Sequence, residues 1–228
     1  MTVLAPSRVT RTLVLVIACL AALGTFVQLA RYAWGFVDCL GLIPAFDLGG
    51  ERNIPTWVST SILLANALAA GWLASESRRA KEPGAWHWVL LCLFTGWCSM
   101  DELAGIHESW TRPLRETLHL SGVLYYGWLV PAFAVIAVML GAFWNFTRRL
   151  QPATHVLMAL AAVLYFGGAV GMEMVSGYYH AHVGRANLVY GLLVVVEESL
   201  EMFGATALLE ALLTELRARG AALRVEAR

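Results

Sequence analysis

Ionisable side chains occur inside stretches of the sequence that are otherwise apolar, and they gather in three places. They are Asp101, Glu102, His107 and Glu108 in the first stretch, Glu173 and His180 in the second, and Glu197, Glu198 and Glu201 in the third. A charged side chain at the centre of a membrane helix costs about 2.5–3.5 kcal/mol even on the permissive scale. Because the sequence carries this cost several times, these residues are expected to serve a function, and they are the candidates for chemistry.

Carboxylates that share a low-dielectric site cannot all be ionised unless a positive species compensates them. No Lys or Arg lies at the same depth in these stretches, so protons or metal ions must do it. Helical bundles hold di-iron and di-manganese centres with four carboxylates and two histidines, and such ligands suit Fe, Mn or Zn. The usual Glu-x-x-His spacing is absent. All nine residues are therefore predicted metal ligands by type rather than by motif.

The elements that must position these residues are predicted to be membrane-spanning helices. Of the 228 residues, 59% are hydrophobic and 14% are charged, against about 25% charged in soluble domains. Backbone polar groups in lipid must bond within their own segment, which favours helices. The sequence predicts an all-α, polytopic bundle, a single transmembrane domain over residues 1–228. Its six spans cover about 12–36, 55–75, 86–110, 124–146, 154–178 and 187–212.

Basic residues predict the orientation of the spans, because cytoplasmic loops carry an excess of Lys and Arg. With both chain ends in the cytoplasm, most basic residues fall on that side. They are Arg8, Arg11, Arg78, Arg79, Lys81, Arg148, Arg149, Arg217, Arg219, Arg224 and Arg228. Apolar sequence continues past Cys19, so residues 12–36 are expected to be a retained span rather than a cleaved signal. The predicted location is the cytoplasmic (inner) membrane of a bacterium.

Helical periodicity predicts that the three polar groups meet. Residues seven apart share a helix face, as Asp101 and Glu108 do, and as Glu173 and His180 do. In the sixth span, Glu197, Glu198 and Glu201 fit within one wedge of the helix. All three sets also lie at overlapping depths in the outer half of the bilayer. We expect the third, fifth and sixth spans to turn their polar seams toward one site.

Three further expectations concern the backbone around this site. Pro131 is expected to kink the fourth span. Gly167 and Gly171 form a Gly-x-x-x-Gly pair suited to close helix packing. The long connection 37–54 lies on the same side as the acids, and it is either a lid over them or a solvated turn.

An Asp-Glu…His-Glu span followed by a Glu-Glu-x-x-Glu span resembles a family of multipass bacterial membrane proteins of uncharacterised function. The residues that carry the resemblance are Asp101, Glu102, His107 and Glu108, followed by Glu197, Glu198 and Glu201. The resemblance covers most of the chain and implies no activity.

The leading hypothesis is an integral membrane metalloprotein, either a di-metal oxidoreductase or a metal-dependent hydrolase, acting on a lipid or a small apolar substrate. The first alternative is a cation or proton transporter or channel that uses the acids as a relay. The second is a structural subunit of a larger membrane complex. The expected partners are membrane lipids and either further copies of the chain or a larger complex. Zero net charge argues against nucleic acid.

Overall fold

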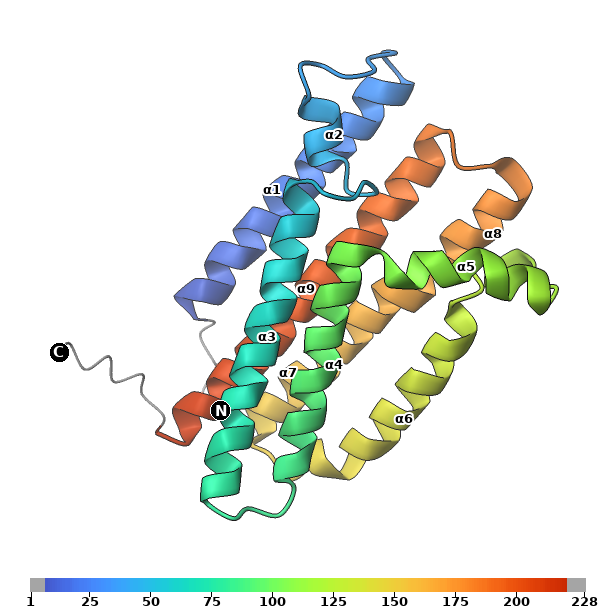
Figure 1. The fold of residues 1–228 in the computed structure, drawn as a ribbon. Helices are drawn as coiled ribbons and strands as arrows, with labels where there is room; N and C mark the ends of the chain where they lie inside the picture. Colours follow the sequence, from blue (N-terminus) through green and yellow to red (C-terminus); the bar gives the residue numbers. More distant parts are fainter. Residues whose placement is uncertain (1–6, 221–228) are drawn as a thin grey trace.

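The computed structural model describes residues 7–220, which form helices joined by short turns with no strand among them (Figure 1). The predicted all-helical fold is confirmed, while Arg224 and Arg228 lie outside the described residues. The elements are α1 (Arg8–Tyr32), α2 (Leu42–Phe46), α3 (Ile54–Arg79), α4 (Ala85–Ala104), α5 (Ile106–Thr117), η1 (Gly122–Leu124), α6 (Leu129–Thr147), α7 (Pro152–Phe166), η2 (Gly167–Met172), α8 (Glu173–Val183) and α9 (Leu188–Ala218).

Four stretches of helix are long and apolar enough to cross a membrane, which indicates a membrane protein. They are α1, α3, α6 and the continuous run Pro152–Val183 through α7, η2 and α8, and α4 with α5 makes a fifth if the bent pair is one span. The sixth predicted span, α9, is outside this set because every stretch of sufficient length in it carries too many charges. Length and apolarity thus support up to five of the six predicted spans.

Helix α9 lies inside the bundle, where it contacts α1, α3, α7, η2 and α8 (Figure 1). Its own residues include a long buried row from Met202 to Glu215. A helix surrounded by protein can carry polar side chains that a lipid-facing helix cannot. The position of α9 therefore explains how an acid-rich helix fits this fold.

The bundle has two distinct ends, which we name by what lies there. At the terminal end, α1 begins and α9 finishes, and the amide of Ser7 donates to the Glu210 carboxylate at 3.2 Å. At the loop end, α2 and its flanking loops cover α1 and α3, and α5 runs across the bundle (Figure 1). The start of α1 and the end of α9 thus share one end of the molecule.

The predicted third span, 86–110, is not one straight helix. Helix α4 ends at Ala104, and α5 leaves it at 81°. Gly105 forms the corner with φ +59°, a left-handed conformation that costs other residues about 1–2 kcal/mol. The expectation that Asp101 and Glu108 share a helix face was wrong, because the turn at Gly105 breaks the helical periodicity between them.

Two other backbone expectations were also wrong. Pro131 lies in the first turn of α6, where a missing N–H leaves no bond unmade, so it does not kink the helix. A Cβ on Gly167 would meet nothing within 4 Å, whereas one on Gly168 would meet the backbone of Glu197 at 2.8 Å. The π-helical turn Gly167–Met172 inserts an extra residue per turn, which moves the close contact from the predicted glycines to Gly168.

Candidate functional site

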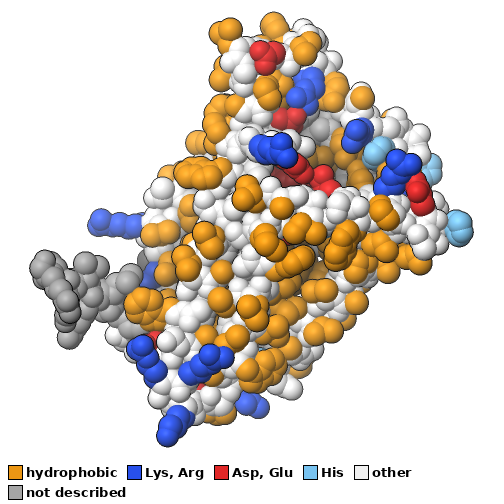
Figure 2. Space-filling view, in the orientation of Figure 1, with side chains coloured by type: hydrophobic (Ala, Val, Ile, Leu, Met, Phe, Trp, Pro, Cys, Tyr) orange, Lys and Arg blue, Asp and Glu red, His pale blue; other side chains and the backbone are white. Residues whose placement is uncertain are grey.

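A cavity of about 1240 Å³ opens at the loop end between α4, α5, α6, α8 and α9. Figure 2 shows acidic side chains in this hollow, with basic side chains and histidine around it. Every candidate ligand from the sequence lines it: Asp101, Glu102, His107, Glu108, Glu173, His180, Glu197, Glu198 and Glu201. The fold therefore brings the three groups of predicted ligands to one space, although the bend at Gly105 breaks the single helix face expected for the third span.

Helix α9 supplies one wall of the cavity, and η2 sets how closely α8 approaches it. Because Gly168 has no side chain, the η2 backbone lies directly against α9 at Glu197 and Glu201. Ser176 of α8 donates to Glu197 Oε2 at 3.1 Å across the same interface. The carboxyls of Glu198 and Glu201 repel each other and also interact with Glu102 of α4. Carboxylates from two helices thus share the floor of the cavity.

The α4–α5 corner brings Asp101 and His107 together. Asp101 Oδ1 accepts the backbone N–H of His107 at 2.9 Å, and Asp101 Oδ2 lies 2.6 Å from His107 Nδ1. Burial lowers the pKa of His107, but its bond to Asp101 and the negative charges of Asp101, Glu173 and Glu108 together outweigh this, so the net shift is upward. Since the carboxylate accepts from Nδ1, Nε2 is the nitrogen left for other partners. Asp101 thus orients the ring and caps α5.

Glu173 and Trp128 lie beside His107. The Trp128 ring lies 4.7 Å from the His107 ring, centroid to centroid, and the indole neighbours the Glu173 carboxyl. Even so, Glu173 Oε2 and Trp128 Nε1 are buried without a hydrogen-bond partner in the described part of the chain. A buried polar atom left unpaired costs about 1–3 kcal/mol. Glu173 is therefore an acceptor that lacks its partner.

The deep carboxyls share this lack of compensation. Within residues 7–220, no Lys, Arg or His forms an ion pair with Glu102, Glu173, Glu197, Glu198 or Glu201. The basic residues that line the cavity are Arg31, Arg112, Arg115 and Arg185. Arg31 pairs with Asp47 at 2.6 Å, and Arg112 pairs with the exposed Glu116 at 2.7 Å. Arg31 and Arg112 thus serve other acids rather than the deep ones, and Arg115 stacks on the Tyr125 ring.

The segment 47–51 of the long connection covers part of the mouth, which answers the alternatives left open for 37–54. Asp47 accepts from Gln28 of α1 at 2.8 Å in addition to its pairing with Arg31. The Glu51 side chain lies over Gly105, so close that a Cβ there would meet Glu51 Oε1. Burial raises the pKa of Glu108, and the neighbouring Glu51 raises it further. This segment therefore acts as a cover that adds two acids to the rim.

His180 lies apart from the deep carboxyls, in a group of tyrosines. Its Nδ1 is 3.1 Å from Tyr126 Oη, which is 2.6 Å from Tyr190 Oη. Tyr125 packs on the same imidazole with ring centroids 4.6 Å apart. Burial raises the pKa of Tyr126, so its hydroxyl stays protonated. His180, although a predicted ligand, is thus held on the cavity wall by the neighbouring tyrosines.

Several residues of the cavity were missed from the sequence. Trp128, Tyr126 and Tyr190 lie at helix ends or in loops, where aromatic residues of membrane proteins are common and signal nothing specific. Gln28 is different, because it is a polar residue in the first apolar span and is 3% exposed. A buried amide within a span could have pointed to α1 as a wall of the site.

Side-chain positions do not form a finished metal centre. Among the described residues, no three Cys, His, Asp or Glu side chains converge closely enough to hold a metal ion. Among the Glu side chains that line the cavity, Glu197 accepts a hydrogen bond from Ser176 in the described chain. Ligation would therefore need changes of rotamer at Glu102, Glu198 and Glu201.

The fold and the site define a class: a helical membrane protein with an acid-lined cavity at one end of its bundle. The chain belongs to the family described as Domain of unknown function (DUF8692), which matches residues 9–216. No curated protein matches the chain, and no solved structure matches it.

Proposed function

We propose that this protein binds divalent metal in the acid-lined cavity. With two metal ions it would act as a di-metal oxidoreductase, and otherwise as a metal-dependent hydrolase, on a lipid or small apolar substrate. Fe, Mn and Zn are the candidate metals, because carboxylate oxygens and one imidazole are the donors that suit them. The observation that carries the proposal is the set of deep carboxyls without any basic partner among the described residues. A bound cation supplies the missing positive charge.

The proposed ligands come from four helices. Glu102 of α4, Glu173 of α8, and Glu198 and Glu201 of α9 contribute oxygens, and His107 contributes Nε2. Asp101 takes a supporting role, because its carboxylate already holds His107 Nδ1 at 2.6 Å. Metal-binding histidines almost always donate their other N–H to such a partner. Glu108 and Glu197 are the nearest remaining acids for moving protons.

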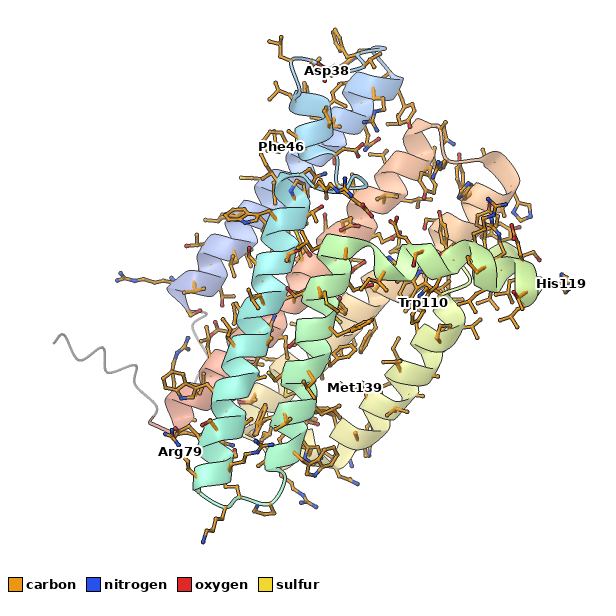
Figure 3. All side chains as sticks on the ribbon, viewed as in Figure 1. Asp38, Phe46, Arg79, Trp110, His119 and Met139 are labelled. Carbon is orange, nitrogen blue, oxygen red and sulfur yellow. The ribbon has the colours of Figure 1, made fainter. Side chains whose placement is uncertain are left out.

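The proposed topology has six crossings with both chain ends in the cytoplasm of a bacterium. α4, which ends at the bend to α5, makes the third crossing. α9 makes the sixth crossing and is surrounded by other helices of the bundle. The α3–α4 and α6–α7 turns, which carry Lys and Arg, fall at the terminal end (Figure 1). Arg79 lies there (Figure 3), and Arg219 of the same end pairs with Glu82 of the α3–α4 turn. This arrangement follows the positive-inside rule and opens the cavity to the periplasm.

Elemental analysis of the full chain, purified in mild detergent, tests the metal. Zn would favour the hydrolase, and Fe or Mn the oxidoreductase. After removal of metal with a chelator, titration with Mn²⁺, Fe²⁺ and Zn²⁺ should show binding that Glu201→Gln abolishes. Glu116→Gln makes the same charge change on the exposed face of α5 and should bind like the wild type. Wild-type protein that holds no metal as purified and binds none of the three would overturn the proposal.

One observation favours a second candidate, a proton pathway along α9. Thr206 Oγ1 and Asn66 Oδ1 are buried without hydrogen-bond partners in the described chain, and they lie between Glu201 and the terminal end. Water molecules bridging these atoms would continue a hydrogen-bonded path from Glu201 toward the terminal end. Proton uptake into proteoliposomes that disappears in Thr206→Val would support this pathway. Equal proton leakage in vesicles with wild-type protein, vesicles with Thr206→Val and empty vesicles would exclude it.

A further inference from the structure

A second cavity, of about 320 Å³, lies between α4, α6, α7 and α9 on the terminal side of the acid-lined cavity. Its lining is apolar except for Thr95, Thr147 and His155. An engineered apolar cavity of about 150 Å³ stays free of water and binds benzene. This space is thus large and apolar enough for a hydrocarbon larger than benzene.

The two cavities adjoin. Phe94 and Cys98 of α4, with Tyr165 and Phe166 of α7, line both of them. Cys98 contacts Tyr165, and both interact with Glu201. The inner surface therefore changes from carboxyls to hydrocarbon within a few side chains. A molecule that fits both parts must be amphiphilic.

Helix α6 lines the two cavities with one continuous face. Pro131, Ala132, Val135 and Ile136 border the acid-lined cavity, and Met139, Leu140, Phe143, Trp144 and Thr147 border the apolar one. These positions recur at intervals of three and four, which places them on one side of the helix. In Figure 3, Met139 lies on the side of α6 that faces α4. This face of α6 looks onto cavity space instead of a neighbouring helix.

The length of this face matches a lipid chain. From Met139 to Thr147, the part that borders the apolar cavity, the helix rises by roughly 12 Å, which fits within one leaflet, half of the ~30 Å hydrocarbon core. Leu140 and Trp144 are also partly exposed on the outside of the bundle, at 51% and 60%. The apolar cavity is therefore bordered by residues that face lipid.

We propose that the apolar cavity holds one acyl chain of a membrane lipid, whose polar end reaches the carboxyls of the acid-lined cavity. The substrate class is then a fatty-acyl lipid with the bond to be changed near Glu102 and Glu201. The inference rests on the proposed metal function only for what happens at that polar end. The position of the chain stands on the cavity itself.

Photolabelling tests where the chain lies. The full-length protein is reconstituted in phosphatidylethanolamine vesicles that contain a small share of the same lipid with a diazirine on one acyl chain. After irradiation, peptides with Phe94, Met139 and Phe143 should be labelled as well as lipid-facing peptides. Labelling confined to residues on the outside of the bundle would overturn the inference.

Matched variants locate the effect. Ala162→Phe fills part of the cavity from α7. If the acyl chain can then bury two fewer methylene groups there, its binding weakens about tenfold, and labelling of the cavity peptides should fall by the same factor. Leu160→Phe, on the same helix but outside the lining, should leave it unchanged. Leu140→Trp narrows the cavity from α6 and is a second variant should Ala162→Phe fail to fold. Unaltered labelling in a folded filling variant would contradict the proposal.

The failure of this inference can be told apart from the failure of the proposed function. Ala162→Phe leaves the carboxyls untouched, so it should bind Mn²⁺ like the wild type. Glu201→Gln should lose Mn²⁺ and keep the acyl-chain labelling. If the wild type binds no metal but its cavity peptides are labelled, the proposed function is wrong and the lipid site is supported.

Discussion

Helix α9 carries two groups of glutamates whose surroundings differ. At the loop end, Glu198 and Glu201 line a cavity without a basic partner in the described chain. At the terminal end, Glu210 accepts from Ser7, Thr10 and Arg217, while Glu215 accepts from Thr154 at 3.0 Å. The same residue type on one helix is thus left unpaired at one end and fully bonded at the other.

Arg219 extends the bonded group across the bundle. It pairs with Glu215 at 3.0 Å and with Glu82 at 2.8 Å, and it donates to Ser77 at 2.7 Å. These bonds tie the end of α9 to α3 and to the turn after it. The chain thus satisfies buried acids where they hold helices together. Where it leaves acids unpaired, protons or a bound cation would have to compensate them, and the proposed function takes the cation.

The largest effect on stability is expected at the terminal end. Glu215→Ala leaves Thr154 and Arg219 without their carboxylate, so it should lower the free energy of unfolding by about 3 kcal/mol, as for other buried pairs that lose one partner. Thermal unfolding in detergent measures it. Glu116→Ala, which breaks an exposed pair, should change stability by no more than ~1 kcal/mol. Equal losses in the two variants would break the comparison.

Gly105→Ala tests the corner that directs His107 into the cavity. A left-handed conformation costs alanine about 1–2 kcal/mol, and the new Cβ would also displace Glu51. We expect destabilisation of that size together with weaker Mn²⁺ binding. Gly141→Ala in α6 meets nothing within 4 Å and should stabilise the protein, by about 0.5–1 kcal/mol. Unchanged unfolding in Gly105→Ala would show that the corner is not needed.

Asp101→Asn separates the orientation of His107 from the stability of α5. Loss of the charged cap costs about 1 kcal/mol, whereas loss of an orienting carboxylate lowers metal affinity about 10–100-fold. Calorimetry with Mn²⁺ distinguishes the two effects. Asn187→Ala removes the cap of α9 and should reduce stability by a similar amount with little change in affinity. Identical affinities in Asp101→Asn and the wild type would assign Asp101 a capping role alone.

The smallest change in stability is expected at the unpaired acids, and its sign is opposite. Glu173→Gln removes an acid that has no basic partner in the described chain, so metal-free protein should be as stable as the wild type or up to ~1 kcal/mol more stable. The same variant should bind Mn²⁺ more weakly. Unfolding curves with and without Mn²⁺ provide both numbers. A large loss of stability in the metal-free variant would place Glu173 with the structural acids of the terminal end.

Much of this arrangement could be predicted from the sequence, because apolar length and helical periodicity determine it. The helices, the position of Glu198 and Glu201 on the cavity wall, and their meeting with Glu102 follow from these two patterns. The bend at Gly105 was missed, although a glycine followed by the polar run from His107 is typical of a helix end. The Asp101–His107 pair could not be predicted without that bend.

The remaining differences come from tertiary contacts that no local pattern encodes. The π-helical turn at Gly167–Met172 shifts the periodicity of the fifth span, so the glycine that touches α9 is Gly168. The cover formed by 47–51 depends on Arg31 and Gln28 of α1, which are distant in sequence. The apolar cavity exists because α6 stands away from α4 and α7, and its sequence alone looks like any other span.

The most direct test of the central claim is to locate a cation in the cavity. Crystals of the full chain grown with Mn²⁺ and measured for anomalous scattering should show a peak among Glu102, Glu173, Glu198 and Glu201, with His107 Nε2 turned toward it. Absence of any peak there at saturating Mn²⁺, with the carboxyls bonded to one another or to water, would contradict the account.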